Sequence, residues 1–131
     1  MHVLRRMVEA VRPGGLVLDL QVIRPNPVVE SGGVALCEID GEPLFGNADA
    51  ATAAVDACVR GGRLREEAVD DHDVRKHYRS GGAVVDWYAD DDRRIPDEAV
   101  ERLRTMTAPR AVRERCRLRK LRVVPFLTQA T

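Results

Sequence analysis

Five side chains between residues 70 and 77 have the chemistry of metal ligands. They are Asp70, Asp71, His72, Asp73 and His77. Neutral imidazoles and carboxylates are good ligands for divalent metal ions. On a strand, however, His72 and His77 are an odd number of residues apart and face opposite sides, and on a helix they lie about 140° apart. We therefore expect no metal site in this segment.

No serine or cysteine has a plausible histidine partner beside it in the sequence. Ser31 and Ser80 lie in Gly-rich turns. The three cysteines, Cys37, Cys58 and Cys116, are far apart and form no C-x-x-C pair, so we interpret them as small buried residues of a protein in a reducing compartment. The sequence thus identifies no nucleophilic site.

The range 110–122 is rich in arginine and could bind phosphates together with Arg102 and Arg104. It contains no aromatic residues for base stacking. The whole chain has 21 basic and 21 acidic residues, so it has no overall attraction to nucleic acid or anionic membranes. Alternating arginines also protect a strand edge from aggregation. We expect neither nucleic acid nor a membrane as partner.

The chain has 131 residues, which is typical of one domain that folds without disulfides or metals. Its first fifteen residues contain no apolar run long enough for a signal peptide, and no segment resembles a membrane span. We therefore expect a cytoplasmic protein.

Hydrophobic spacing predicts a helix over residues 2–11, which the turn Pro13-Gly14-Gly15 ends. Leu16 to Ile23 then alternate as a strand with one wholly apolar face and a second face that carries two polar groups. This pattern favours an interior parallel strand covered on both sides. The sequence R-P-N-P at 24–27 is expected to break the strand.

A small β-meander is expected from about 28 to 45, with Asp40-Gly41 as a hairpin turn. Asn47 is expected to cap the next helix, which ends at Gly61-Gly62. A strand from Arg63 to Val69 follows.

The polar range 70–79 has no clear pattern. A short helix is expected after Ser80-Gly81-Gly82, and Pro96 opens another. The range 115–127 alternates as a strand whose parity shifts by one, which predicts a bulge near Arg119 or Lys120.

The order of these elements resembles the carboxy-terminal half of a class I S-adenosylmethionine-dependent methyltransferase. LRRMVEAVRPGGLVLDL, residues 4–20, matches the helix, R-P-G-G turn and fifth strand of that family. GGRLREEAV, residues 61–69, corresponds by order to its sixth strand, and RCRLRKLRVVPF, residues 115–126, to its antiparallel seventh. The resemblance implies an α/β, Rossmann-like sheet with an inserted β-meander and an antiparallel last strand.

In this family, a Gly-rich loop after the first strand and an acidic residue after the second hold the cofactor. This sequence has no G-x-G-x-G after a strand. We therefore expect residues 1–131 to form a single partial domain that begins about two thirds of the way through the fold. It should bind no S-adenosylmethionine alone and be inactive unless another chain supplies the missing half.

The resemblance also implies a substrate side, formed by the region after the sixth strand and the neighbouring helix. These positions are His72, Lys76, His77, Tyr78, Trp87 and Tyr88. A His or Tyr there could act as a general base or orient an acceptor hydroxyl. The alternative is that residues 72–78 are a solvated connection and Trp87 is a core residue.

Arg24 and Asn26 follow the expected end of the first strand, where open α/β sheets place their ligands. They are candidates for substrate binding, and the alternative is a rigid turn.

An exposed apolar strand edge invites pairing with another chain. We expect Leu16 to Ile23 to be covered by a second copy in a homodimer, by a chain that supplies the missing half, or by the meander. Two function hypotheses follow: a methyltransferase-like, substrate-side half-domain, and a non-catalytic dimeric interaction module.

Overall fold

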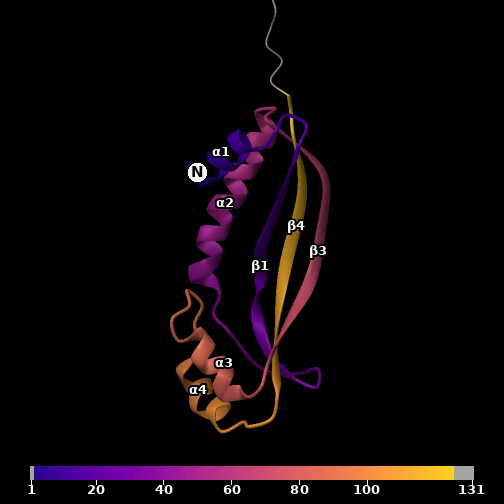
Figure 1. Cartoon of the computed structure of the whole chain (residues 1–131). Coiled ribbons are helices and arrows are strands. Elements are labelled where there is room, and N and C mark those ends of the chain that lie inside the picture. Colours follow the sequence, from indigo (N-terminus) through magenta and orange to yellow (C-terminus); the bar gives the residue numbers. More distant parts are fainter. Residues whose placement is uncertain (1, 126–131) are drawn as a thin grey trace, which may run out of the picture. The chain divides into compact units, whose positions relative to one another are not determined.

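The computed structural model of the protein describes residues 2–125 and folds them into four helices and one four-stranded antiparallel sheet. The elements are α1 (His2–Ala10), β1 (Leu16–Ser31), β2 (Val34–Glu38), α2 (Glu42–Arg60), β3 (Leu64–Tyr78), α3 (Gly81–Tyr88), α4 (Asp97–Arg104) and β4 (Arg110–Val123). The strand order is β2-β1-β4-β3, so the last strand lies between β1 and β3 (Figure 1). The α/β class is as predicted.

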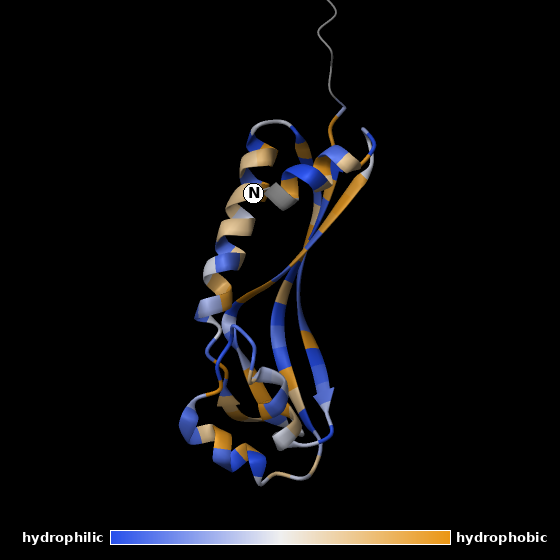
Figure 2. Cartoon of the chain, turned by 60° about the vertical axis from the view of Figure 1, so that its left-hand side comes forward, coloured by the Kyte–Doolittle hydropathy of each residue, from blue (hydrophilic) through white to orange (hydrophobic). Residues whose placement is uncertain are grey.

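Two compact units share the three long strands. The first unit contains residues 2–21, 48–71 and 117–125, and the second contains residues 22–47 and 72–116. The core of the first unit is formed by Val17, Val55, Leu64, Leu121 and Val123. The core of the second unit is formed by Val29, Ile39, Val84, Val85, Tyr88, Leu103 and Val112. Figure 2 shows hydrophobic and hydrophilic residues alternating along the helices, as expected for elements with one buried face.

The helices predicted over residues 2–11, after Ser80 and after Pro96 are confirmed as α1, α3 and α4. The Ser80 hydroxyl accepts a hydrogen bond from the backbone N–H of Ala83 at 3.1 Å and caps α3. Gly81 is required where α3 meets α4, because a Cβ atom there would lie 2.2 Å from the carbonyl oxygen of Leu103. In α4, Ala99 and Leu103 are buried as predicted.

β1 differs from its prediction in direction, length and exposure. It pairs antiparallel with β2 over Val28 to Ser31 and continues through residues 24–27, so the prediction of a parallel strand broken by R-P-N-P was wrong. Both prolines lie before the range that pairs with β2, and the carbonyl oxygen of Pro27 still accepts a hydrogen bond from the backbone N–H of Ile39 at 2.8 Å. Val17 is buried on the face that packs into the core, but Leu18 and Leu20 are 62% and 59% exposed on the other face.

The segment predicted as a meander over 28–45 is a hairpin followed by a helix. Gly32 and Gly33 have φ values of +55° and +83° and form the turn between β1 and β2, a conformation that glycine adopts readily. Asp40-Gly41 is not a hairpin turn: the Asp40 carboxylate accepts a hydrogen bond from the backbone N–H of Glu42 at 3.1 Å, at the start of α2. Asn47 lies inside α2, so its prediction as the cap was wrong.

β3 extends to Tyr78 through the polar range that had no predicted structure. In the first unit, side chains of β4 pair with acidic side chains of β3: Arg122 with Glu67 at 2.9 Å, and Arg117 with Asp71 at 2.8 Å. In the second unit, Arg115 of β4 contacts Asp73 of β3 at 3.2 Å. Arg115, Arg117 and Arg122, which the sequence offered as part of a phosphate-binding surface, therefore have acidic partners within the sheet.

The buried positions of β4 change parity along the strand. Val112, Glu114 and Cys116 are buried at even numbers, whereas Arg119 and Leu121 are buried at odd numbers. This shift was predicted from the sequence. The predicted end of the strand at residues 126–127 lies outside the described residues.

Among residues 2–125, none of the helices has the length and apolar character needed to cross a membrane.

Candidate functional site

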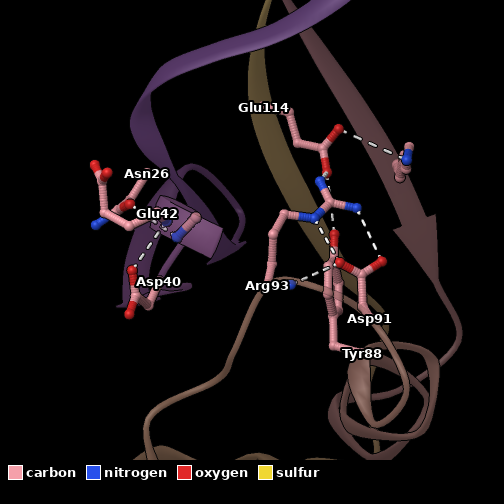
Figure 3. A network of polar contacts seen from close by, with 9 residues as sticks. Asn26, Asp40, Glu42, Tyr88, Asp91, Arg93 and Glu114 are labelled. Atoms are coloured by element: carbon pink, nitrogen blue, oxygen red, sulfur yellow. Dashed lines mark hydrogen bonds and ion pairs between the residues drawn. The ribbon is translucent and has the colours of Figure 1, made fainter. Parts of the chain in front are cut away.

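A buried polar network lies in the second unit, where β3, α3, the loop that follows α3 and β4 come together (Figure 3). Its centre is Glu114 on β4, whose side chain is 2% exposed. One carboxylate oxygen accepts a hydrogen bond from the Tyr88 hydroxyl at 3.1 Å and another from the Arg93 guanidinium. The second oxygen lies 3.6 Å from Nζ of Lys76. Both oxygens of this buried carboxylate therefore have partners.

Arg93 connects Glu114 to a second carboxylate. Its Nε donates to Oδ1 of Asp91 at 2.9 Å and its Nη2 donates to Oδ2 at 3.2 Å, a two-pronged pair. The guanidinium carbon also lies 5.0 Å from the centre of the Tyr88 ring, within the range of a cation–π contact. Arg93 and Lys76 together balance the two carboxylates.

The electrostatics of this network favour a structural role. Burial, and next the charge of Glu114, raise the pKa of Tyr88, so its hydroxyl stays protonated and remains a donor. The hydrogen bond from Arg93 lowers the pKa of Asp91, so this carboxylate stays charged. The network therefore holds no free base for proton transfer; it joins α3 to β4.

A cavity of about 360 Å³ lies beside this network in the second unit. Its walls include Tyr88, Asp91, Arg94 and Ile95. The polar wall groups that belong to the network, Tyr88 and Asp91, already have partners.

The structure brings together only some of the predicted substrate-side residues. Lys76 and Tyr88 meet at Glu114, and Tyr78 contacts Trp87 with ring centroids 6.5 Å apart. Trp87 is 60% exposed, so its alternative interpretation as a core residue was wrong.

His72 and His77 lie on β3 at the odd spacing that sends their side chains to opposite faces. His72 is half-buried and His77 is exposed. Within the described part of the chain, no three His, Cys, Asp or Glu side chains are grouped so that they could hold a metal ion.

Arg24 and Asn26 contact the start of α2. Arg24 forms a paired hydrogen bond with Glu42 at 3.1 Å, and its guanidinium carbon lies 5.0 Å from the centre of the Phe45 ring. The Asn26 carbonyl oxygen accepts a hydrogen bond from the backbone N–H of Gly41 at 3.0 Å (Figure 3). Both side chains therefore contact the residues at which α2 begins and help to fix its position.

Sequence reasoning missed Glu114, Arg93 and Asp91. The available signal was Glu114, which alternates with Val112 and Cys116 on one face of β4. A carboxylate on an apolar strand face needs a buried cationic partner, but the sequence does not say which of its many arginines supplies it.

A second candidate surface lies in the first unit, along β1. Among the described residues, β2 pairs with β1 only from Val28 to Ser31, so the main chain of Leu16 to Gln21 has no strand on that side. Leu16, Leu18 and Leu20 are 42%, 62% and 59% exposed there.

Polar groups on the opposite face of the same segment are only partly satisfied. Gln21 donates a hydrogen bond from Nε2 to Oδ1 of Asp19 at 2.9 Å. Oδ2 of Asp19 is buried and has no hydrogen-bond partner among the described residues. A buried acceptor without a donor is costly, so this strand segment is incomplete in its hydrogen bonding as well as in its strand pairing.

Comparison with family models, curated proteins and solved structures finds no match to this chain. Of the two candidate sites, the buried network around Glu114 has its charges paired. The β1 segment has an open edge, exposed leucines and one carboxylate oxygen without a hydrogen-bond partner among the described residues.

Proposed function

We propose that the protein is a non-catalytic interaction module in which the open edge of β1 accepts a strand from another polypeptide. The main-chain groups of an edge strand are a template for strand addition. The observation that carries the proposal is the coincidence, in Leu16 to Gln21, of an unpaired edge with three exposed leucines.

The three described cysteines form no disulfide, which suits a reducing compartment. We therefore propose the cytoplasm as the place where the module acts.

Hydrogen exchange of the β1 amides tests this function. In the assembled state, the amides of Leu16 to Gln21 that do not face β4 should become protected as the protein concentration, or the concentration of an added partner, rises. The amides of β2 serve as the control, because their exchange should not depend on concentration. Fast exchange along β1 under every condition would contradict the proposal.

A second candidate function is the methyltransferase-like, substrate-side half. It is favoured by the sheet order, in which β1 and β3 each follow a helix and the last strand, β4, lies antiparallel between them. In this function the β1 edge would accept a chain that carries the S-adenosylmethionine loop, and the protein alone would be inactive.

Isothermal titration with S-adenosylmethionine separates the two candidates. The interaction module should give no saturable heat, alone or with its partner. Binding by the complex but not by the isolated chain would favour the methyltransferase-like function.

A further inference from the structure

A cavity of about 280 Å³ lies in the second unit, beside the turn that joins β1 to β2. Its walls come from the end of β1 with this turn, the last part of β3 and the start of β4. Two arginines, Arg75 and Arg110, line it together with one carboxylate, Glu30. Among the described residues, no member of the network around Glu114 lines this cavity.

Glu30 holds Arg75 in place at the cavity. The Glu30 side chain is 7% exposed, and its carboxylate accepts hydrogen bonds from Nε of Arg75 at 2.7 Å and from Nε of Arg113 at 3.3 Å. The hydrogen bond from Arg75 lowers the pKa of Glu30, although burial opposes this effect, so the carboxylate stays charged. Arg75 uses its Nε in this pair, which leaves its two terminal amino groups available to a ligand.

Arg110 carries a charge that no acidic side chain balances within residues 2–125. Its Nη1 donates to the carbonyl oxygens of Ala108 and Pro109 at 3.0 and 2.9 Å, which fixes the guanidinium at the cavity wall. In the described part of the chain, its Nη2 has no hydrogen-bond partner and, unlike Nε, is not buried. This amino group can therefore donate to a molecule in the cavity without giving up a contact in the chain.

The charges at this cavity leave a positive surplus. Three guanidinium groups and one carboxylate gather there, those of Arg75, Arg110, Arg113 and Glu30. Asp73, which also acts on Arg75, is paired with Arg115 at 3.2 Å. Two positive charges therefore have no counterpart in the chain.

We propose that this cavity binds the phosphoryl group of a small molecule. A phosphate ester carries a charge of about −1.5 to −2 at neutral pH, which balances the surplus, and its oxygens match the planar fork of an arginine. Pro109 and Ala111 add apolar wall against which a small organic body can pack. The site is separate from the β1 edge and does not depend on the proposed function.

Isothermal titration at pH 7.5 and low ionic strength, with inorganic phosphate and with phenyl phosphate, tests the site. Both should bind to wild type with one site per chain. Arg110→Gln should weaken the binding of both about tenfold or more, because it removes charge-assisted hydrogen bonds. Arg102→Gln is the matched control: it removes the same charge from an exposed position of α4 that does not line the cavity, and it should bind like wild type.

Arg110→Lys separates a lost contact from a lost fold. Lysine keeps the charge but not the two-pronged geometry, so this variant should bind phosphate more weakly than wild type and more tightly than Arg110→Gln. Without phosphate, the midpoint of thermal unfolding should differ little among wild type and the two Arg110 variants.

The two probes also distinguish the source of the phosphoryl group. Tighter binding of phenyl phosphate would assign the site to phosphate esters, and equal affinity would assign it to free phosphate; both results support the proposal. A wild type that binds neither probe, or that binds acetate as tightly as phosphate, would overturn it. Equal weakening by Arg110→Gln and Arg102→Gln would also overturn it. Hydrogen exchange along β1 tests the interaction module separately, so either proposal can fail without the other.

Discussion

Glu114 is one of the buried charges of the second unit, and its side chain has three partners there. Replacing it by glutamine leaves Arg93 with one carboxylate partner and Lys76 with none in the network. We expect Glu114→Gln to lower the free energy of unfolding by about 2–4 kcal/mol, because a buried ion pair that loses one partner leaves charge unpaired. Urea unfolding measures this change.

Arg115→Gln is the control for Glu114→Gln. Arg115 pairs with Asp73 at 3.2 Å, but both side chains are more than one third exposed. Such a pair contributes about 0–1 kcal/mol. If both variants lost the same stability, the central role of Glu114 would be wrong.

The protonation of Glu67 makes the stability of the first unit depend on pH in the acid range. Hydrogen bonds from Arg122 and Arg65 lower the pKa of Glu67 from 4.5 to about 2. A carboxylate with a lowered folded-state pKa stabilises the fold above its unfolded pKa, and this contribution is lost as the pH falls toward the folded value. The stability difference between wild type and Glu67→Gln should therefore be largest above about pH 5 and shrink toward pH 2.

Unfolding curves at several pH values measure the Glu67 contribution. Glu9→Gln, at an exposed position of α1, controls for the loss of one negative charge. A stability difference between wild type and Glu67→Gln that stays constant from pH 6 to pH 2 would contradict the assignment.

At the scale of elements, the start of α2 is fixed by Asp40 and not by Asn47. Removing a side chain that satisfies a free N–H at a helix start costs about 0.5–2 kcal/mol. We expect Asp40→Ala to lose stability in this range and Asn47→Ala to change it little, as measured by thermal unfolding. The reverse ranking would place the helix start where the sequence suggested.

The helices that the sequence predicts well have local signals. Ser80 caps α3 and Pro96 precedes α4, so a few neighbouring residues decide where each helix starts. The burial of Leu103 then follows from the helical spacing of the apolar residues in α4 alone.

The strands were harder to predict because their partners are distant in the sequence. β3 is polar along most of its length, and Glu67, Asp71 and Asp73 pair with arginines about 40 to 55 positions later in the chain. β1 continues through Pro25 and Pro27, where local turn signals predict a break. The candidate site was predicted in part for the same reason: Lys76 and Tyr88 were named, but Glu114 and Arg93, which join them, were not.

At the scale of the whole molecule, the two candidate sites differ in the role that we assign to them. The network around Glu114 pairs its charges and holds the second unit together. The β1 segment of the first unit has an edge without a strand partner and exposed leucines, and we propose that it accepts a strand of a second polypeptide.

The mass of the protein in solution tests this account most directly. Sedimentation equilibrium at micromolar concentration should give twice the 14.6 kDa mass of the chain for wild type and for Val34→Glu, a change at an exposed position of β2. Leu20→Glu should give the mass of a single chain, because it places a charge among the exposed leucines of β1. A wild-type protein that sediments as a 14.6 kDa monomer across that range would contradict self-association through β1.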